Sequence, residues 1–349
     1  MPDDVQDNYG SLNYRNVRRI TLGHYSFDTW FGNSAPFLPN EPELLAYNAI
    51  HNGIKRSTSH RKVIEYAKTR KPWIDTLYFC STCFKYSDDP AIVEKHSIGC
   101  PYRAHFPGKV MYCDDEVTIR KVKGSKHKLF CQCLCVLAKF FLDNKSVFYN
   151  LEHFDFYVIY KKSDEGISTP MGFYSRELIS WEDNNLSCIM VIPCYQKQHL
   201  GTKLVDFSYR LSTYQQIISG PERPLSSLGR MTFLSYWSGR LCIEFLYGSL
   251  VTFKTLTLEV ISRKTGFRVN DILMTLDYMK SFLESGKKDP YTDYYTERSH
   301  EKEDDEGDFV FLTDDNYQLY IDKSRLKQWV VDHHIRDEPI LKEEGLILY

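Results

Sequence analysis

The sequence contains no apolar run near the roughly 20 residues that a membrane-spanning helix requires. It has no excess of basic residues either, because 44 lysines and arginines are balanced by 46 aspartates and glutamates. Such a balance gives no global positive field of the kind that drives nucleic-acid binding. Residues 1–10 are polar and acidic, unlike a signal or transit peptide, and we find no internal repeat or low-complexity tract. We therefore expect no membrane association and no direct DNA binding.

What is present describes a globular protein. The chain has 349 residues, of which 42% are hydrophobic and 15% aromatic, enough for a sizeable core and two or three packed modules. Ten cysteines without a secretory signal favour reduced thiols and metal binding over disulfides. We expect an intracellular protein.

The first part of the chain combines short strands with loops. We expect residues 1–14 to form a flexible polar leader, and the mixed aromatic and aliphatic segment Val17–Phe31 to form short strands and turns. Three prolines within residues 32–54 indicate a loop. The basic segment Lys55–Lys71 is read as a solvated linker or helix face, with an acidic partner as the alternative.

The central third has the clearest patterns. Residues His127–Asp143 have helical periodicity, Phe154–Tyr160 has the composition of a strand, and Leu186–Ile192 is a continuous apolar run typical of a strand covered on both faces. Gly201–Tyr214 follows as a predicted helix, so the polar loop before it lies at a helix N-terminus. The buried face predicted for the first helix consists of Phe130, Leu134, Leu137 and Phe141.

The chain beyond Pro224 is expected to be mainly helical. Thr257–Lys280 contains two short helical patterns around Gly266, a helix-turn-helix-like arrangement. It lacks a clear basic recognition face, which favours packing over DNA reading. The mostly acidic run Arg298–Asp308 is predicted to be a solvated loop.

A cysteine and histidine cluster provides the strongest local signal. Cys80 and Cys83 form a CxxC pair, and His96 and Cys100 follow after twelve residues at helical i, i+4 spacing. Zinc prefers four such ligands in a tetrahedron, and four protein ligands leave no open position, so we predict a structural zinc. Six further cysteines are expected to be small buried side chains: Cys113, Cys131, Cys133, Cys135, Cys194 and Cys242.

Several ordered motifs give the chain a family resemblance. The zinc-ligand spacing is followed by the segments FPGK at 106–109, LFCQCLC at 129–135, AKFFLDNK at 138–145, NNLSCIM at 184–190 and GPERPLS at 220–226. In this order they resemble the MYST family of histone acetyltransferases over about residues 15–285, and within it the fungal silencing subgroup. The resemblance implies an α/β fold with a GNAT-like acetyl-CoA-binding core and a mixed sheet, between an N-terminal CCHC zinc finger and a C-terminal helix-turn-helix-like region. The implied parts are a finger at about 72–112, a core at about 113–235, a helical part at about 236–285, and an extension with an acidic loop at 286–349.

The resemblance also implies a chemistry. Lysine titrates near 10.4, so its amine must lose a proton before it attacks a thioester, and a nearby carboxylate can accept that proton. Glu222 matches the family's catalytic base, although a glutamate between prolines is more often a surface turn residue. Cys188 matches a cysteine beside the acetyl group, which could carry the acetyl as an intermediate or only shape the pocket. We favour direct attack, with the acyl-cysteine route as the alternative.

The coenzyme loop matches the family with one departure. Unpaired amides at a helix N-terminus bind a pyrophosphate well, but His199 occupies the position of the pattern's first glycine, and its Cβ can crowd the phosphates. Lys139 matches a lysine that the family's enzymes acetylate on themselves. The expected coenzyme contacts are Ile189, Met190, Val191, Gln196, Lys197, Gln198, His199, Leu200, Gly201, Thr202 and Ser226.

Two functions from different classes follow from these features. The first is a nuclear enzyme that transfers acetyl from acetyl-CoA to a lysine, on the histone H4 tail by resemblance to the silencing subgroup, together with other subunits of a small complex. The second is a catalytically impaired fold that serves as a scaffold, for which His199 is the reason. Acetyl-CoA binding distinguishes the two.

Overall fold

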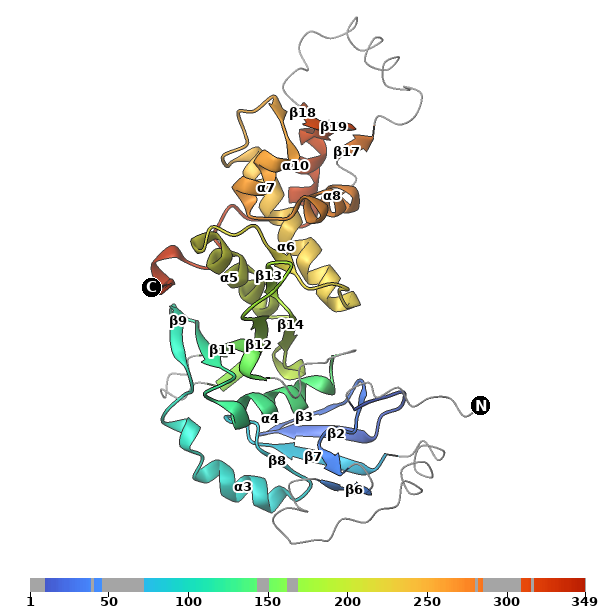
Figure 1. Cartoon of the computed structure of the whole chain (residues 1–349), viewed down its shortest axis with the longest axis vertical. Helices are drawn as coiled ribbons and strands as arrows, with labels where there is room; N and C mark the ends of the chain where they lie inside the picture. Colours follow the sequence, from blue (N-terminus) through green and yellow to red (C-terminus); the bar gives the residue numbers. More distant parts are fainter. Residues whose placement is uncertain are drawn as a thin grey trace, which may run out of the picture. The chain divides into compact units, whose positions relative to one another are not determined.

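A computed structural model describes residues 10–38, 41–45, 72–142, 151–161, 169–279, 282–284, 309–314 and 317–348. It contains two compact units, which we describe separately (Figure 1). Unit 1 comprises Met1–Ile179, Ser187–Leu204 and Glu344–Tyr349, and unit 2 comprises Ser180–Leu186 and Val205–Glu343. Among the helices in the described ranges, none combines the length and apolarity needed to cross a membrane.

The centre of unit 1 is a five-stranded antiparallel sheet in the order β14-β12-β11-β10-β9. The strand predicted at Phe154–Tyr160 is confirmed as β11, which runs on to Lys161. The prediction of a mixed sheet does not hold for this sheet, in which all pairs are antiparallel. Parallel pairs occur in other sheets of the chain. The strands are β9 (Lys109–Cys113), β10 (Val117–Lys123), β11 (Phe154–Lys161), β12 (Thr169–Glu177) and β14 (Cys188–Val191).

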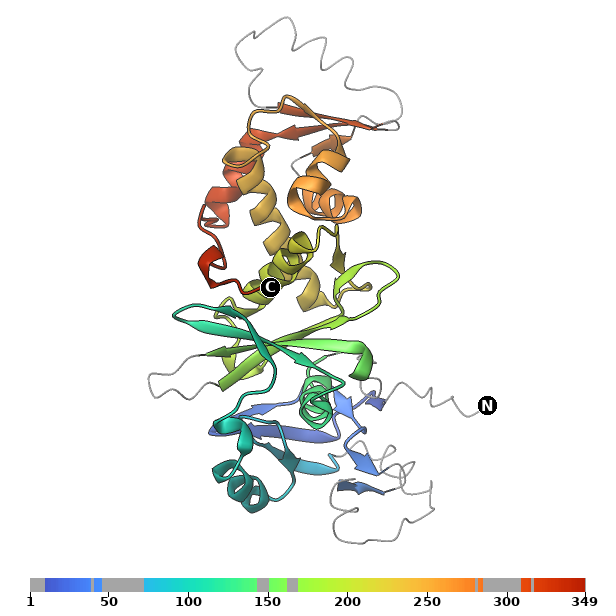
Figure 2. The same cartoon turned by 60° about the vertical axis from the view of Figure 1, so that its left-hand side comes forward.

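Helix α4 (Lys128–Lys139) covers one face of this sheet (Figure 2). The prediction of a helix from His127 is confirmed, but α4 ends at Lys139, four residues before the predicted end. Phe141 therefore lies beyond the helix, where it packs against Phe27 and Trp30. The predicted face is buried because its side chains share one core with alternate residues of β11, together with Val122 of β10 and Phe173 of β12.

A second sheet of unit 1, in the order β3-β2-β7-β8, carries the cysteine cluster. The short strands predicted within Val17–Phe31 are confirmed. Two other predictions are wrong in part: residues 11–12 of the leader pair with 32–33, and the predicted loop contains three short strands, because these segments find hydrogen-bonding partners in each other. The elements are β1 (Ser11–Leu12), β2 (Val17–Leu22), β3 (Tyr25–Asp28), β4 (Gly32–Asn33), β5 (Phe37–Leu38), β6 (Glu41–Leu45), β7 (Ile74–Phe79) and β8 (Tyr86–Ser87).

Unit 2 is built around helices. The helices expected on both sides of Gly266 are present, and Gly266 ends the first of them with a φ of 75°, a conformation that favours glycine. The long helix α6 packs against α7, α8 and α10. The helices are the C-terminal part of α5 (Leu200–Tyr214), then α6 (Ser227–Leu246), α7 (Leu258–Thr265), α8 (Val269–Tyr278) and α10 (Lys323–Asp332).

Unit 2 also contains strands that the sequence did not predict. A four-stranded sheet in the order β16-β18-β19-β17 accompanies the helices, and the parallel pair β13-β15 lies near the candidate base. The segments Lys55–Lys71 and Arg298–Asp308 lie outside the described residues. The strands are β13 (Asn184–Leu186), β15 (Gly220–Pro221), β16 (Thr255–Leu256), β17 (Phe282–Glu284), β18 (Phe309–Asp314) and β19 (Tyr317–Asp322).

Candidate active site and metal centre

The four predicted metal ligands of unit 1 come together. The ligand atoms of Cys80, Cys83, His96 and Cys100 all lie within 4.8 Å of one another, and Cys83 Sγ is 3.1 Å from His96 Nε2. Three thiols and one imidazole at this spacing suit a zinc ion bound in a tetrahedron. The contact between Cys80 and Cys83 lowers the pKa of Cys80 to about 4 and raises that of Cys83, as expected where the first thiolate is already stabilised by the second thiol. The four residues could therefore hold one structural zinc.

One detail of the metal prediction is wrong. Cys100 does not lie on the same helix as His96, because helix α3 (Pro90–Ile98) ends before Gly99, and Cys100 has an extended φ, ψ of −66°, 120°. The chain leaves the helix there and still directs the thiol to the cluster. The finger is continuous with the core of unit 1, because Phe84 packs against Phe130 of α4 with ring centroids 5.7 Å apart.

The other six cysteines divide into two groups. Burial raises the pKa of Cys133 and Cys242, each to about 12, which suits inert core thiols. Cys131 and Cys135 are buried as well. Cys113 and Cys194 are only half-buried, so for these two the prediction of burial is wrong.

The predicted strand around Cys188 is interrupted. Ser187 separates β13 from β14, and its amide donates to Ser175 O of β12 at 2.7 Å. Strand β14 lies at the edge of the five-stranded sheet, so Cys188, Ile189 and Val191 are half-buried rather than covered on both faces. A ligand can reach a thiol at such an edge, whereas it cannot reach a fully buried thiol.

The coenzyme loop follows β14 directly. A short turn, η3 (Pro193–Tyr195), leads out of the strand, and the Tyr195 ring meets Tyr25 of β3 edge-on with centroids 5.4 Å apart. The Gln196 side-chain amide donates to Val191 O at 3.1 Å, which fastens the loop to the strand end. Helix α5 starts at Leu200, one residue before the predicted start. Its first amides have no acceptor within the helix and can bind an anion.

His199 has a backbone conformation that favours glycine. Its φ is 56°, and Lys197 also has a positive φ of 62°. Non-glycine residues adopt this region at a cost of about 1–2 kcal/mol. The histidine therefore does not prevent the turn, but it adds a side chain where the family pattern has none. The side chains of Lys197, Gln198 and His199 are exposed.

We expect His199→Gly to bind acetyl-CoA severalfold more tightly, because a glycine adopts this φ without strain and lets phosphate approach the amides. Isothermal titration calorimetry measures the change. The matched control is Gln198→Gly, which places a glycine at a neighbouring exposed position without a positive φ. Equal affinities for His199→Gly and the parent chain would show that the histidine does not impair the loop.

Glu222 lies in unit 2 at the end of the parallel pair β13-β15. Its backbone amide donates to Leu186 O at 2.8 Å, and its side chain is exposed. Leu186 precedes Cys188 by two residues in the sequence. The backbone bond therefore fixes the position of Glu222 relative to β13 of the same unit, while its side chain stays exposed.

A charged network that the sequence did not reveal holds the Glu222 segment. The Arg223 guanidinium forms an ion pair with Asp271 of α8, which is 1% exposed. Arg268 donates to Pro221 O at 3.3 Å and to Asn184 Oδ1 at 2.8 Å, so it joins the two strands of the pair. Burial raises the pKa of Asp271, and the charge of Arg223 opposes that rise. No local motif marks Asp271 or Arg268, because their partners are far away in the sequence.

Gly220 allows this network to form. An added Cβ would lie 2.5 Å from Asp271 Oδ2, so a side chain at this position would displace the Asp271 carboxylate. The glycine therefore leaves room for the Asp271 side chain where it pairs with Arg223.

We expect Asp271→Asn to lower kcat about tenfold with little change in KM for acetyl-CoA, because the neutral amide no longer holds Arg223 and the Glu222 segment loosens. Steady-state kinetics with a lysine peptide measure both parameters. Asp277→Asn, an exposed position on the same helix, is the matched control. Equal kinetics of the two variants would limit Asp271 to a role in stability, which thermal melting reports separately.

Two other predicted site residues have structural partners. Ser226 is the N-cap of α6, and its hydroxyl oxygen accepts a hydrogen bond from the Gly229 amide at 3.1 Å. Lys139 is 2% exposed, and its Nζ donates to Ser11 Oγ of β1 at 3.0 Å. The simplest interpretation of the sequence, in which Lys139 is a solvated lysine on a helix face, is therefore wrong.

Comparison with known proteins agrees with these features. The chain is 41% identical over 280 residues to the protein named histone acetyltransferase SAS2 from Saccharomyces cerevisiae, covering 80% of this chain and 79% of that protein. It is 33% identical to histone acetyltransferase MOF from Drosophila melanogaster, over 76% of this chain and 28% of that protein. With histone acetyltransferase KAT6B from Homo sapiens the identity is 38%, over 62% of this chain and 10% of that protein. The chain thus spans most of the first relative and a small part of the other two. The MOZ/SAS family matches residues 105–330, and the chain belongs to that family.

Proposed function

We propose that the protein is a histone lysine acetyltransferase that transfers acetyl from acetyl-CoA to a lysine of the histone H4 tail. The observation that carries the proposal is the exposed carboxylate of Glu222 on a backbone fixed to Leu186. Membership of the MOZ/SAS family and relatives named histone acetyltransferases support it.

The proposed reaction needs a base and an acyl donor. Glu222 accepts a proton from the lysine ammonium, and the neutral nitrogen attacks the thioester carbonyl carbon. The carbon–sulfur bond then breaks, so an amide forms and coenzyme A leaves as its thiol after taking up a proton. In the alternative route the acetyl group first moves to Cys188 Sγ and then to lysine. We favour direct attack, since Glu222 alone suffices for the proton transfer.

Acetyl-CoA is proposed to bind along the edge of β14 and at the start of α5. The edge strand offers backbone groups from Ile189 to Val191, and the loop from Gln196 to Thr202 offers amides that can bind the pyrophosphate. Ser226 keeps a hydroxyl hydrogen to donate to the coenzyme while its oxygen caps α6.

Lys139 is proposed to be acetylated by the enzyme itself. An amide at a 2% exposed position removes a buried charge, which is costly in a protein interior. We expect intact mass spectrometry of active enzyme to show one added acetyl group, with peptide mapping placing it on Lys139. A Lys139→Arg variant should lack it. An unmodified Lys139 in fully active enzyme would contradict the proposal.

The protein is further proposed to act in the nucleus with other subunits of a small complex. The alternative, an impaired fold that serves as a scaffold, is favoured only by His199 in the coenzyme loop.

The decisive experiment incubates the recombinant chain, alone and with candidate partner proteins, with labelled acetyl-CoA and each core histone. Label on a lysine of H4 is expected, and mass spectrometry then gives its position. Binding of acetyl-CoA without transfer to any histone would exclude H4 as substrate. Absence of acetyl-CoA binding would favour the scaffold.

A further inference from the structure

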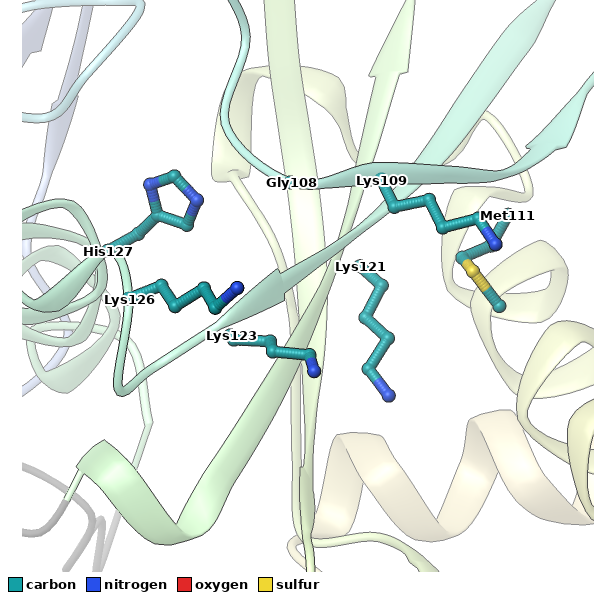
Figure 3. Close-up of a pocket in the computed structure, with 7 residues that line it drawn as sticks. All are labelled: Gly108, Lys109, Met111, Lys121, Lys123, Lys126 and His127. Atoms are coloured by element: carbon teal, nitrogen blue, oxygen red, sulfur yellow. The ribbon is translucent and has the colours of Figure 1, made fainter.

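We propose that a lysine-lined pocket in unit 1 binds the phosphate backbone of DNA beside the histone substrate. The choice of DNA depends on the proposed action on histones, since DNA accompanies histones in chromatin. The pocket has a volume of about 500 Å³, and four of the seven residues that line it are lysines (Figure 3). Its lining is Gly108, Lys109, Met111, Lys121, Lys123, Lys126 and His127, without an acidic side chain. We refer to it as the lysine pocket.

The lysines come from adjacent pieces of one rigid surface. Lys109 of β9 and Lys121 of β10 are direct partners across the antiparallel pair, and Lys123 follows two residues later on the same face. Lys126 extends from the turn before α4 toward Lys123 (Figure 3). Two strands and a turn therefore place four ammonium groups around one pocket.

The wall of the pocket is firmly built. Gly108 has a φ of 82°, and a Cβ there would lie 2.2 Å from Lys121 O, so only glycine lets β9 approach β10 this closely. The Arg120 guanidinium donates to Pro107 O at 3.1 Å and to Gly108 O at 2.7 Å, which fixes the start of β9. The lysine stems therefore stand on backbone held in place by these contacts.

An acidic residue beside the pocket is in ionic contact with Lys121. Asp155 of β11 lies 2.6 Å from Lys121 Nζ, and its side chain is 5% exposed. The Asp155 carboxylate offsets the charge of Lys121, while the side chains of Lys123 and Lys126 are exposed, so the lining is basic although the whole chain has a net charge of −2. The lysine pocket is also apart from the coenzyme loop, because β9 and β14 are opposite edges of the same sheet.

The chemistry of the surface favours DNA over an acidic peptide. A peptide would be recognised along the free edge of β9 through main-chain hydrogen bonds. The chain's own C-terminal segment takes part of that edge, because the Ile347 amide donates to Met111 O at 2.8 Å and Leu346 bridges Tyr112. The lysine ammonium groups can contact phosphates without main-chain hydrogen bonds to the ligand. Such contacts do not depend on the base sequence of the DNA. The lysine-rich substrate itself would be repelled.

The test measures DNA binding by the full chain. A fluorescent 20-base-pair duplex is titrated at several salt concentrations, with Lys123→Glu/Lys126→Glu as the pocket variant. We expect the pocket variant to bind DNA at least roughly tenfold more weakly than the parent chain at 100 mM salt. The slope of log affinity against log salt concentration should be less steep by about two, which corresponds to two lost phosphate contacts. Both lysines are exposed, so folding should persist.

The control carries the same change of net charge elsewhere. Lys161→Glu/Lys264→Glu alters two exposed lysines, one at the end of β11 that is about 20 Å along the sheet from the level of Lys123, and one on α7. This variant should bind DNA nearly as the parent chain does. Equal losses in both variants, or no binding by the parent chain at 50 mM salt, would overturn the proposal.

Two more arms separate the proposal from its alternatives. The first measures the binding of a fluorescent polyglutamate peptide. If the pocket variant loses affinity for this peptide but keeps its affinity for DNA, the surface binds an acidic protein and the DNA assignment is overturned. Acetylation of a free H4 peptide should stay within about twofold of the parent rate in the pocket variant, whereas acetylation of nucleosomes should fall. If the parent chain acetylates no histone, the proposed function fails, while the DNA titration still decides the nature of the pocket.

Discussion

Glu222→Gln is expected to lower the rate of acetyl transfer to a lysine peptide by about 10²–10⁴-fold, the usual contribution of a general base. The amide keeps the shape of the side chain but cannot take a proton. The residual rate should rise about tenfold per pH unit between pH 7 and 9, because it then depends on the small fraction of lysine that is already neutral. Steady-state assays across this pH range measure both effects, and acetyl-CoA affinity should stay unchanged.

Cys188→Ala provides the matched comparison for this variant. Under direct attack it should keep most of its turnover, because the thiol at the edge of β14 then only shapes the pocket. Mass spectrometry of rapidly quenched reactions should likewise find no acetyl group on Cys188. The reverse result, in which Cys188→Ala is inactive and Glu222→Gln is active, would establish the acyl-cysteine route and remove Glu222 from the central role.

Loss of the zinc ligands is expected to have the largest effect on stability. His96→Ala should reduce bound zinc from one per chain to nearly none, and it should lower the melting temperature of unit 1 by more than about 10 °C. The physical reason is that zinc binding in finger peptides contributes about 10–16 kcal/mol, as much as the whole stability of an ordinary domain. Elemental analysis and calorimetric melting measure the two quantities.

The control for the metal variant is His105→Ala, an exposed histidine nine residues further on that is not part of the cluster. It should keep both the zinc and the melting temperature. The destabilisation by His96→Ala should extend to α4, because Phe84 of the finger packs on Phe130 of that helix. Hydrogen exchange of the α4 amides shows whether it does. A zinc-free His96→Ala protein that melts like the parent would contradict a structural metal.

Local patterns predicted several elements well. The strand β11 and the start of α4 were found within one residue, the strand from its aromatic and β-branched composition and the helix from its periodicity. The interruption at Ser187 was missed, because it lies where the chain changes its pairing partner from β15 to β12, and the apolar run from Leu186 to Ile192 gives no sign of that change. The end of α3 before Cys100 was also missed, because the spacing of His96 and Cys100 fits both a continuous helix and a chain that leaves the helix between them.

The candidate site shows the same limit. Glu222 and Cys188 were selected by resemblance, but the ion pair that steadies the Glu222 segment joins residues 48 positions apart. The burial of Lys139 depends on a partner 128 positions away, in a strand that the sequence suggested to be a flexible leader. The sequence did not show whether His199 can adopt the turn of the coenzyme loop, and the structure shows that it does so with a positive φ.

The sequence by itself determined the zinc-ligand set, the order of the family motifs and the identity of the candidate base. The zinc-ligand set depends on residue types at short spacings, and the candidate base depends on a match to the family motifs; a linear chain displays both directly. The tertiary structure decided which lysine is buried, which aspartate holds the Glu222 segment, and where positive charge accumulates on a chain of almost balanced composition. Net charge sums over all residues, whereas a local field depends on distance, so four lysines brought together on two strands and a turn form a basic pocket that composition cannot reveal.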